Sequence, residues 1–124
     1  MLVVFILGVE PSGLPDNCLA IVKSALAHLM PRLSSRQLWR MLGITLLPGI
    51  DDFPWKTEVT YLSEVQDILY YSLRHPFSLI TIWAIQRDNG RCPGAIDSNS
   101  YSGIVQSRWA FSRLIESFIR GTGS

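Results

Sequence analysis

Two adjacent carboxylates, Asp51 and Asp52, come shortly after an apolar run at residues 43–47. In folds built from parallel strands and helices, polar residues beyond the carboxyl end of a strand are where ligand contacts are made. A carboxylate in such a place accepts hydrogen bonds and donates none. The pair is therefore a candidate ligand contact, and a turn or cap pair is the alternative interpretation.

Trp83 lies within another apolar run, at residues 79–85. An indole in a buried strand is ordinarily a core side chain, and the pattern of the run favours that role. A flat indole face can also support the apolar face of a sugar ring. The run by itself does not decide between the two.

Other kinds of site find no support in the sequence. Cys18 and Cys92 have no metal-binding spacing with His28 or His75, and both histidines are expected to face solvent or to cap a helix. Two buried or free thiols are expected, with a disulfide between them as the alternative. There is no Gly-x-Ser-x-Gly nucleophile motif, and the glycines of residues 8–13 lack the lysine of a phosphate-binding loop. The sequence therefore predicts no metal ion and no cofactor.

The elements that must position these residues alternate between strand and helix. Three runs, at residues 2–7, 43–47 and 79–85, are apolar nearly throughout, as parallel strands covered on both faces require. Helices are expected after Pro15, from Ser34 or Ser35 to about Met41, after a cap at Thr60, and up to a stop at Gly121. Their apolar faces carry Leu19, Val22, Leu26, Leu29 and Met30; Leu62, Val65, Ile68, Leu69 and Leu73; and Phe111, Leu114, Ile115 and Phe118.

The predicted fold class is α/β, a partial (β/α)₈ barrel of about three βα units with parallel strands. The runs start 41 and 36 residues apart, which leaves room for the crossovers that parallel strands need. A complete barrel spends about 30 residues on each unit. A small free-standing doubly wound sheet is the competing architecture, although three strands would leave two unprotected edges.

Composition narrows the classes of partner. Hydrophobic residues make up 48% of the 124 residues and charged residues 17%, a globular balance with a surplus of apolar surface suited to a partner. The net charge is +1 without a basic stripe, so nucleic acid is not an expected partner. Residues 2–7 lack the features of a signal peptide and are too few to span a bilayer, so neither a targeting signal nor a membrane is expected.

Four segments, in this order, resemble the end of the barrel in family 18 glycoside hydrolases, the chitinase family. Residues 39–52, Trp-Arg-Met-Leu-Gly-Ile-Thr-Leu-Leu-Pro-Gly-Ile-Asp-Asp, resemble its seventh strand, commonly Gly-Val-Thr-Pro-Met-Ile-Gly-x-Asn-Asp. Residues 58–62, Glu-Val-Thr-Tyr-Leu, are similar to its Glu-Val-Phe-Thr-Leu. Residues 78–88 resemble its eighth strand, Leu-Ser-Met-Trp-Ser-x-x-Arg-Asp. Finally, residues 92–94 and 102–112 resemble its closing Cys-Pro-Gly and Cys-Ser-Gly-x-x-Gln-x-x-x-Ala-Phe-Ser.

The resemblance divides the chain into a sixth unit at residues 1–38, which fits by pattern alone, a seventh at 39–75 and an eighth at 76–124. It implies that chitin or a chito-oligosaccharide is the partner and that the parent protein is secreted and extracellular.

The resemblance also implies roles for individual residues. Trp83 matches the tryptophan that forms the floor of the subsite for the reacting N-acetylglucosamine. Asp51 and Asp52 match an Asn-Asp pair that binds the sugar, although Asp51 cannot donate as the family's Asn does. Glu58 and the Arg87-Asp88 pair are expected to be structural and to tie the loops together, as an ion pair in one interpretation.

The residues that perform hydrolysis in that family are not found in this sequence. Members carry Asp-x-x-Asp-x-Asp-x-Glu on the fourth strand, where the Glu protonates the glycosidic oxygen and an Asp orients the acetamido group that attacks the anomeric carbon. The ten acidic residues here form no such motif. Tyr101 also replaces the family's last cysteine, which removes the expected disulfide partner of Cys92, and Pro48 ends the seventh strand.

We therefore expect the C-terminal part of a chitinase-like barrel, with no catalytic residue of its own and no hydrolysis by the 124-residue chain. Two alternatives come from other classes of protein. One is a non-catalytic remnant that binds chito-oligosaccharide through Trp83. The other is a structural α/β domain that self-associates through its open strand edges.

Overall fold

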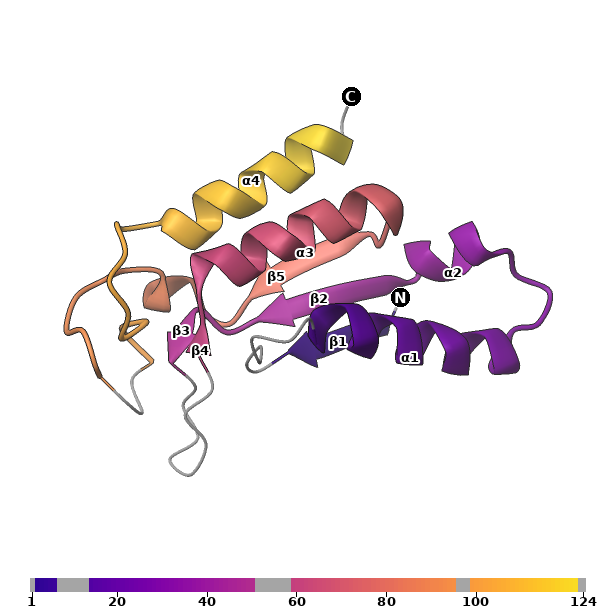
Figure 1. Cartoon of the computed structure of the whole chain (residues 1–124), viewed down its shortest axis with the longest axis horizontal. Coiled ribbons are helices and arrows are strands. Elements are labelled where there is room, and N and C mark those ends of the chain that lie inside the picture. The colour runs from indigo at the N-terminus through magenta and orange to yellow at the C-terminus, as the bar shows by residue number, and fades with distance from the viewer. Residues whose placement is uncertain (1, 7–13, 51–58, 96–98, 123–124) are drawn as a thin grey trace.

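A small parallel sheet with helices along one side forms the body of the chain (Figure 1). The computed structural model describes residues 2–6, 14–50, 59–95 and 99–122, and the side chains of residues 19–50, 59–95 and 99–120.

The central sheet has three strands in the order β1-β2-β5, which are β1 (Leu2–Ile6), β2 (Leu42–Leu46) and β5 (Leu79–Ile82). Both pairings are parallel, and Ile44 of β2 is opposite Val4 on one side and Ile80 on the other. The three strands correspond to the three apolar runs, and all five residues of β2 are buried. The predicted α/β class with three βα units and parallel strands is confirmed.

Helices complete each unit. The first strand is followed by α1 (Leu14–Leu29) and α2 (Ser35–Arg40), the second by α3 (Leu62–Arg74), and the third by α4 (Ala110–Thr122). Figure 1 shows α3 and α4 side by side. None of the helices that the structure describes is long and apolar enough to cross a membrane.

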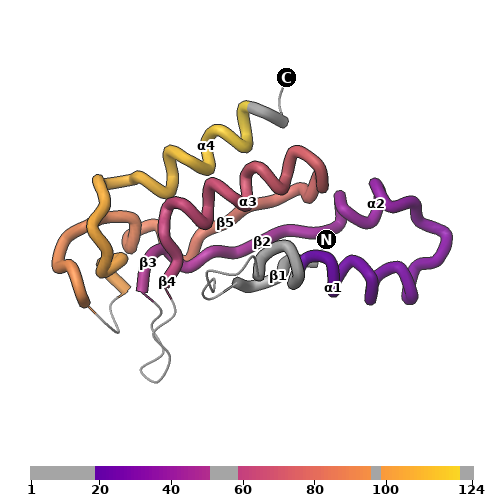
Figure 2. The backbone as a smooth tube through the Cα atoms, viewed as in Figure 1, coloured from indigo at the N-terminus to yellow at the C-terminus, as the bar shows by residue number. Residues whose placement is uncertain are grey.

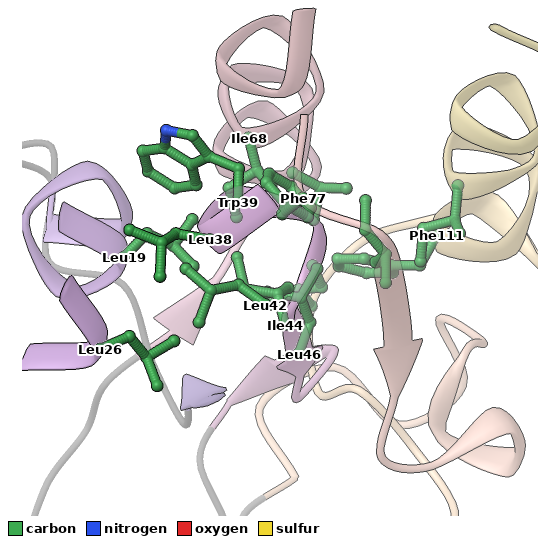
Figure 3. Packing of buried hydrophobic residues seen from close by; sticks show 14 residues of the cluster. Leu19, Leu26, Leu38, Trp39, Leu42, Ile44, Leu46, Ile68, Phe77 and Phe111 are labelled. Carbon is green, nitrogen blue, oxygen red and sulfur yellow. The ribbon is translucent and has the colours of Figure 1, made fainter. Parts of the chain in front are cut away.

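The hydrophobic core joins one face of the sheet to these helices (Figure 3). Leu42, Ile44 and Leu46 alternate along β2, so all three point to the same face, and each is completely buried. They pack in one cluster with side chains from every helix and from β5. The other buried members of the cluster are Leu19, Leu26, Leu38, Trp39, Val65, Ile68, Phe77, Ile80, Ile104, Phe111 and Ile115.

The helix starts follow the local chemistry of the sequence. Ser34 forms a capping box for α2: its hydroxyl accepts from the Gln37 N–H at 3.2 Å, and the Gln37 side chain accepts from the Ser34 N–H at 2.8 Å. The expected cap of α3 at Thr60 is wrong. Thr60 lies in a strand, and the Glu64 carboxylate instead accepts from the N–H of Tyr61, which precedes the helix. The expected stop at Gly121 is also wrong, because α4 extends to Thr122.

Two features of the strands differ from the prediction. The third apolar run stops being a strand at Ile82, and a 3₁₀ turn (Ile85–Arg87) follows. A second, two-stranded sheet pairs β3 (Gly49–Ile50) with β4 (Val59–Thr60) in antiparallel fashion. Strands of two residues carry no hydrophobic periodicity, so sequence reasoning has no signal for them.

Gly49, the first residue of β3, provides a test of how tightly this strand packs against the loop before α4. Its φ is +78°, and an added Cβ would lie 2.0 Å from the Ser102 carbonyl oxygen. Gly49→Ala should therefore lower the free energy of unfolding by about 3 kcal/mol or more, measured by urea denaturation. Gly94→Ala is the matched control, because Gly94 has a φ of +84° and, among the described residues other than its chain neighbours, no atom lies within 4 Å of the added Cβ. It should cost only about 1–2 kcal/mol of backbone strain, and equal losses would contradict the packing argument.

Candidate functional site

The loops that follow β2 and β5 gather at one end of the sheet (Figure 2). Trp83 lies there, directly after the last residue of β5. Its backbone N–H donates to the Leu46 carbonyl at 2.8 Å and so extends the pairing of the two strands. The side chain is 59% exposed, so the core role that the apolar run favours is wrong. The peptide bond between Trp83 and Ala84 is cis.

The alternation of side chains along β5 indicates that Trp83 lies on the face of the sheet away from the helices. Thr45 and Thr81 are opposite each other in the parallel register, and their hydroxyls are hydrogen-bonded at 2.7 Å. Their neighbours Ile44 and Ile80 point to the helices, so the two threonines point the other way. Continuing this alternation past Thr81 places Trp83 on the threonine face, at the carboxyl end of the strands. The exposed indole therefore offers a flat apolar surface where ligands of parallel α/β folds bind.

Arg87 connects the segment after β5 to the segment after β2. Its side chain is buried, with only 1% exposed, at the end of the 3₁₀ turn. The guanidinium donates to the Pro48 carbonyl from Nε at 3.3 Å and from Nη2 at 3.2 Å, and Nη2 also donates to the Ile50 carbonyl. A buried charge needs such partners, and a rigid planar donor fork suits fixed backbone carbonyls.

Asp88, the next residue, is also completely buried but serves α4. Its Oδ2 accepts from the Ser112 N–H at 2.8 Å and the Ser112 hydroxyl at 2.6 Å, while Oδ1 accepts from the Phe111 N–H at 3.0 Å and the Gln106 amide at 2.8 Å. The first N–H groups of a helix have no partner within it, and a carboxylate is favoured at that end. The expected structural role of both residues, tying the loops together, is confirmed by these bonds.

Ser102 closes the loop between β5 and α4 against the same end of the sheet. Its carbonyl accepts from the Ile50 N–H at 2.7 Å, and its hydroxyl donates to the Asn89 carbonyl at 3.0 Å. The Asn89 side chain in turn donates to the carbonyls of Gln86 and Ser100. The loop is thus held at several points by backbone groups.

The predicted sugar contacts Asp51 and Asp52 lie outside the described residues, as does Glu58. The described chain reaches Ile50, directly before them, and resumes at Val59. Their predicted roles stay predictions.

The histidines and Cys92 behave as ordinary structural residues. His28 is exposed, as expected. His75 follows the end of α3 with its ring 4.8 Å from that of Trp39 and 4.2 Å from that of Tyr71. Cys92 is a free, exposed thiol, and the Cys18 side chain is outside the described set. In the part of the chain that the structure describes, no three His, Cys, Asp or Glu residues come together as a metal site would require.

Sequence reasoning did not find the Thr45–Thr81 pair or the carbonyls that Arg87 binds. The signal for the threonines was a single polar residue at the third position of two otherwise apolar runs. No such signal exists for the carbonyls, because every residue carries one.

Known proteins that are similar to this chain in sequence or in fold are chitinases. A probable bifunctional chitinase/lysozyme of Escherichia coli (strain K12) is 27% identical over 108 residues. The catalytic domain of a hyperthermophilic chitinase from Pyrococcus furiosus is 24% identical with a TM-score of 0.80, over 88% of this chain. The chain resembles chitinases in sequence and shares their fold. A third match, at 25% identity and a TM-score of 0.75 over 83% of this chain, is a P. furiosus chitinase active-domain mutant in complex with chito-oligosaccharides. No family model matches the chain.

The chain spans only part of each of these proteins. The match covers 84% of this chain but 12% of the E. coli protein, and 35% and 33% of the two P. furiosus chains. A parallel α/β segment that matches about a third of a chitinase catalytic domain is what the predicted partial barrel requires.

Asp88 allows a test of how α4 is attached. Asp88→Asn removes one of the two carboxylate oxygens that accept from the first turn of α4, so the free energy of unfolding should fall by about 1–3 kcal/mol. Amide hydrogen exchange in α4 should accelerate more than in β2. Glu116→Gln, a substitution within α4 itself, is the control. It removes only the exposed ion pair of Glu116 with Arg120, so it should change the free energy of unfolding by less than about 0.5 kcal/mol. Equal losses in the two variants would contradict a specific role for Asp88.

Proposed function

We propose that this chain forms strands six to eight of a family 18 glycoside hydrolase barrel and contributes part of its sugar-binding surface. Residues 1–38, 39–75 and 76–124 would be the sixth, seventh and eighth βα units. Three units are three-eighths of a barrel, close to the 35% of the P. furiosus catalytic domain that the chain matches. The substrate of the parent protein would be a β-1,4-linked N-acetylglucosamine polymer, with an extracellular location.

The observation that carries this proposal is the exposed indole of Trp83 at the carboxyl end of β5. Trp83 is 59% exposed in this chain and lies on the face of the sheet away from the helices, which would be the interior face of the proposed barrel. The face of an indole suits the apolar face of a sugar ring. The resemblance assigns Trp83 to the floor of the subsite for N-acetylglucosamine, and Asp51 and Asp52 to polar contacts beside it.

Hydrolysis is not part of what we propose for the 124-residue chain. The sequence has no Asp-x-Asp-x-Glu motif to supply a proton donor and to orient the acetamido group. Asp88 is the carboxylate nearest in sequence to Trp83, and both of its oxygens are bonded to α4 and Gln106. The expected activity is sugar binding without bond cleavage.

A titration with tetra-N-acetylchitotetraose tests this proposal. The wild-type chain should show a saturable change in tryptophan emission, because the sugar covers Trp83, while no shorter oligomers are released. Trp83→Ala should abolish the saturable change.

Trp109→Phe is the matched control. Among the described residues, Trp109 is the next most exposed tryptophan, at 39%, and it lies directly before α4 rather than at the end of β5. It should leave the affinity unchanged. A wild-type chain that does not bind at millimolar ligand would exclude sugar binding, and release of oligomers would refute the expected inactivity.

The open edges of the sheet favour a second candidate function, self-association. Within the described sheet, β1 and β5 each pair with β2 on one side only. Exposed parallel edges can pair with strands of another copy.

Sedimentation velocity over a range of concentrations tests self-association. We expect a concentration-dependent rise in mass if the edges pair between copies. A monomer that unfolds in one cooperative transition would count against this candidate and leave the sugar-binding proposal untouched.

A further inference from the structure

The segment that carries Trp83 is attached to the end of β2 at two points. At its start, the Trp83 N–H donates to the Leu46 carbonyl at 2.8 Å. At its end, the Arg87 guanidinium donates to the carbonyls of Pro48 and Ile50. Trp83 therefore belongs to a short closed loop of the structure, and at the far end of this loop the Arg87 side chain makes the contact with the residues after β2.

The residues between these two points form a compact connection. The Arg87 N–H donates to the Ala84 carbonyl at 2.9 Å, and the Asp88 N–H donates to that of Ile85 at 3.1 Å, which closes the 3₁₀ turn. Displacement of Arg87 would consequently displace the turn and the residue before it. Ile85 is 60% exposed and does not anchor the turn from the other side.

Arg87 and its neighbour Asp88 bind different parts of the chain. Both side chains are buried to at least 99%, yet Arg87 binds the segment after β2 and Asp88 binds the first turn of α4. Loss of either should destabilise the chain, because each would leave buried polar groups without partners. Of the two, only the loss of Arg87 would remove side-chain contacts between the segment that carries Trp83 and the residues after β2.

We propose that Arg87 is a positioning residue for sugar binding: by holding the carbonyls of Pro48 and Ile50, its guanidinium fixes Trp83 relative to the end of β2. This inference rests on the proposed role of Trp83 as a sugar platform and goes beyond it. The two carbonyls flank the start of β3, since Pro48 directly precedes this strand and Ile50 is its last residue. The planar donor fork of arginine fits them where the single ammonium group of lysine does not.

The test compares Arg87→Gln and Arg87→Lys with Asp88→Asn as the matched control in the adjacent residue. The probe is tetra-N-acetylchitotetraose, titrated against each full-length variant. A second readout is the ¹⁹F resonance of Trp83 in protein labelled with 5-fluorotryptophan, assigned with Trp83→Phe. Arg87→Lys is the milder change and serves as the test variant where Arg87→Gln does not fold.

Arg87→Gln should weaken the affinity roughly tenfold and shift the Trp83 resonance. Arg87→Lys should not restore either value. Asp88→Asn should lower the melting temperature while the affinity and the Trp83 resonance stay at their wild-type values. If Arg87 had only a structural role, the affinity for the sugar would fall in proportion to the loss of stability, in Asp88→Asn as well as in the Arg87 variants.

Wild-type affinity and an unshifted Trp83 resonance in the Arg87 variants would overturn the positioning role. An equal change in Asp88→Asn would also overturn it. If the wild-type chain does not bind the sugar, the proposed function fails, and the Trp83 resonance alone then decides whether Arg87 positions this side chain.

Discussion

The parallel pairing of β2 with both β1 and β5 is the constraint on which the other parts of the chain depend. A strand paired on both sides and covered by helices must be apolar, and every residue of β2 is buried. Parallel pairing also requires a crossover before each new strand, which places α1, α2 and α3 along one face. The alternation of Leu42, Ile44 and Leu46 toward that face then leaves Thr45 and its partner Thr81 on the other.

The same constraint brings the carboxyl ends of the strands to one edge, and the buried charged residues Arg87 and Asp88 follow the end of β5 there. Burial of Arg87 and Asp88 there would be costly if their groups were unpaired, and the structure provides hydrogen-bond partners for both. Arg87 binds carbonyls after β2, and Asp88 binds N–H groups at the start of α4. Two adjacent charged residues thereby join three elements that are distant in sequence.

In the proposed function, sugar recognition by this edge is separate from bond cleavage. An exposed indole on a fixed strand end can support a sugar ring without any acid or base. Hydrolysis needs, in addition, a proton donor held at the glycosidic oxygen, and the sequence contains no motif that would supply it. The chain is similar in fold to about a third of a chitinase catalytic domain, and the proposal assigns binding surface to this part and the catalytic acid to another.

The sequence by itself determined the class of fold and the place of each major element, because apolar runs and helical spacing are local properties. The same holds for the capping box at Ser34, whose partner is three residues away. Only the tertiary structure decided that Trp83 is exposed, that Thr45 and Thr81 bond across two strands, and which groups Arg87 and Asp88 bind. These contacts join residues 18 to 39 positions apart, and no local pattern specifies which groups meet at that range once the strands are paired.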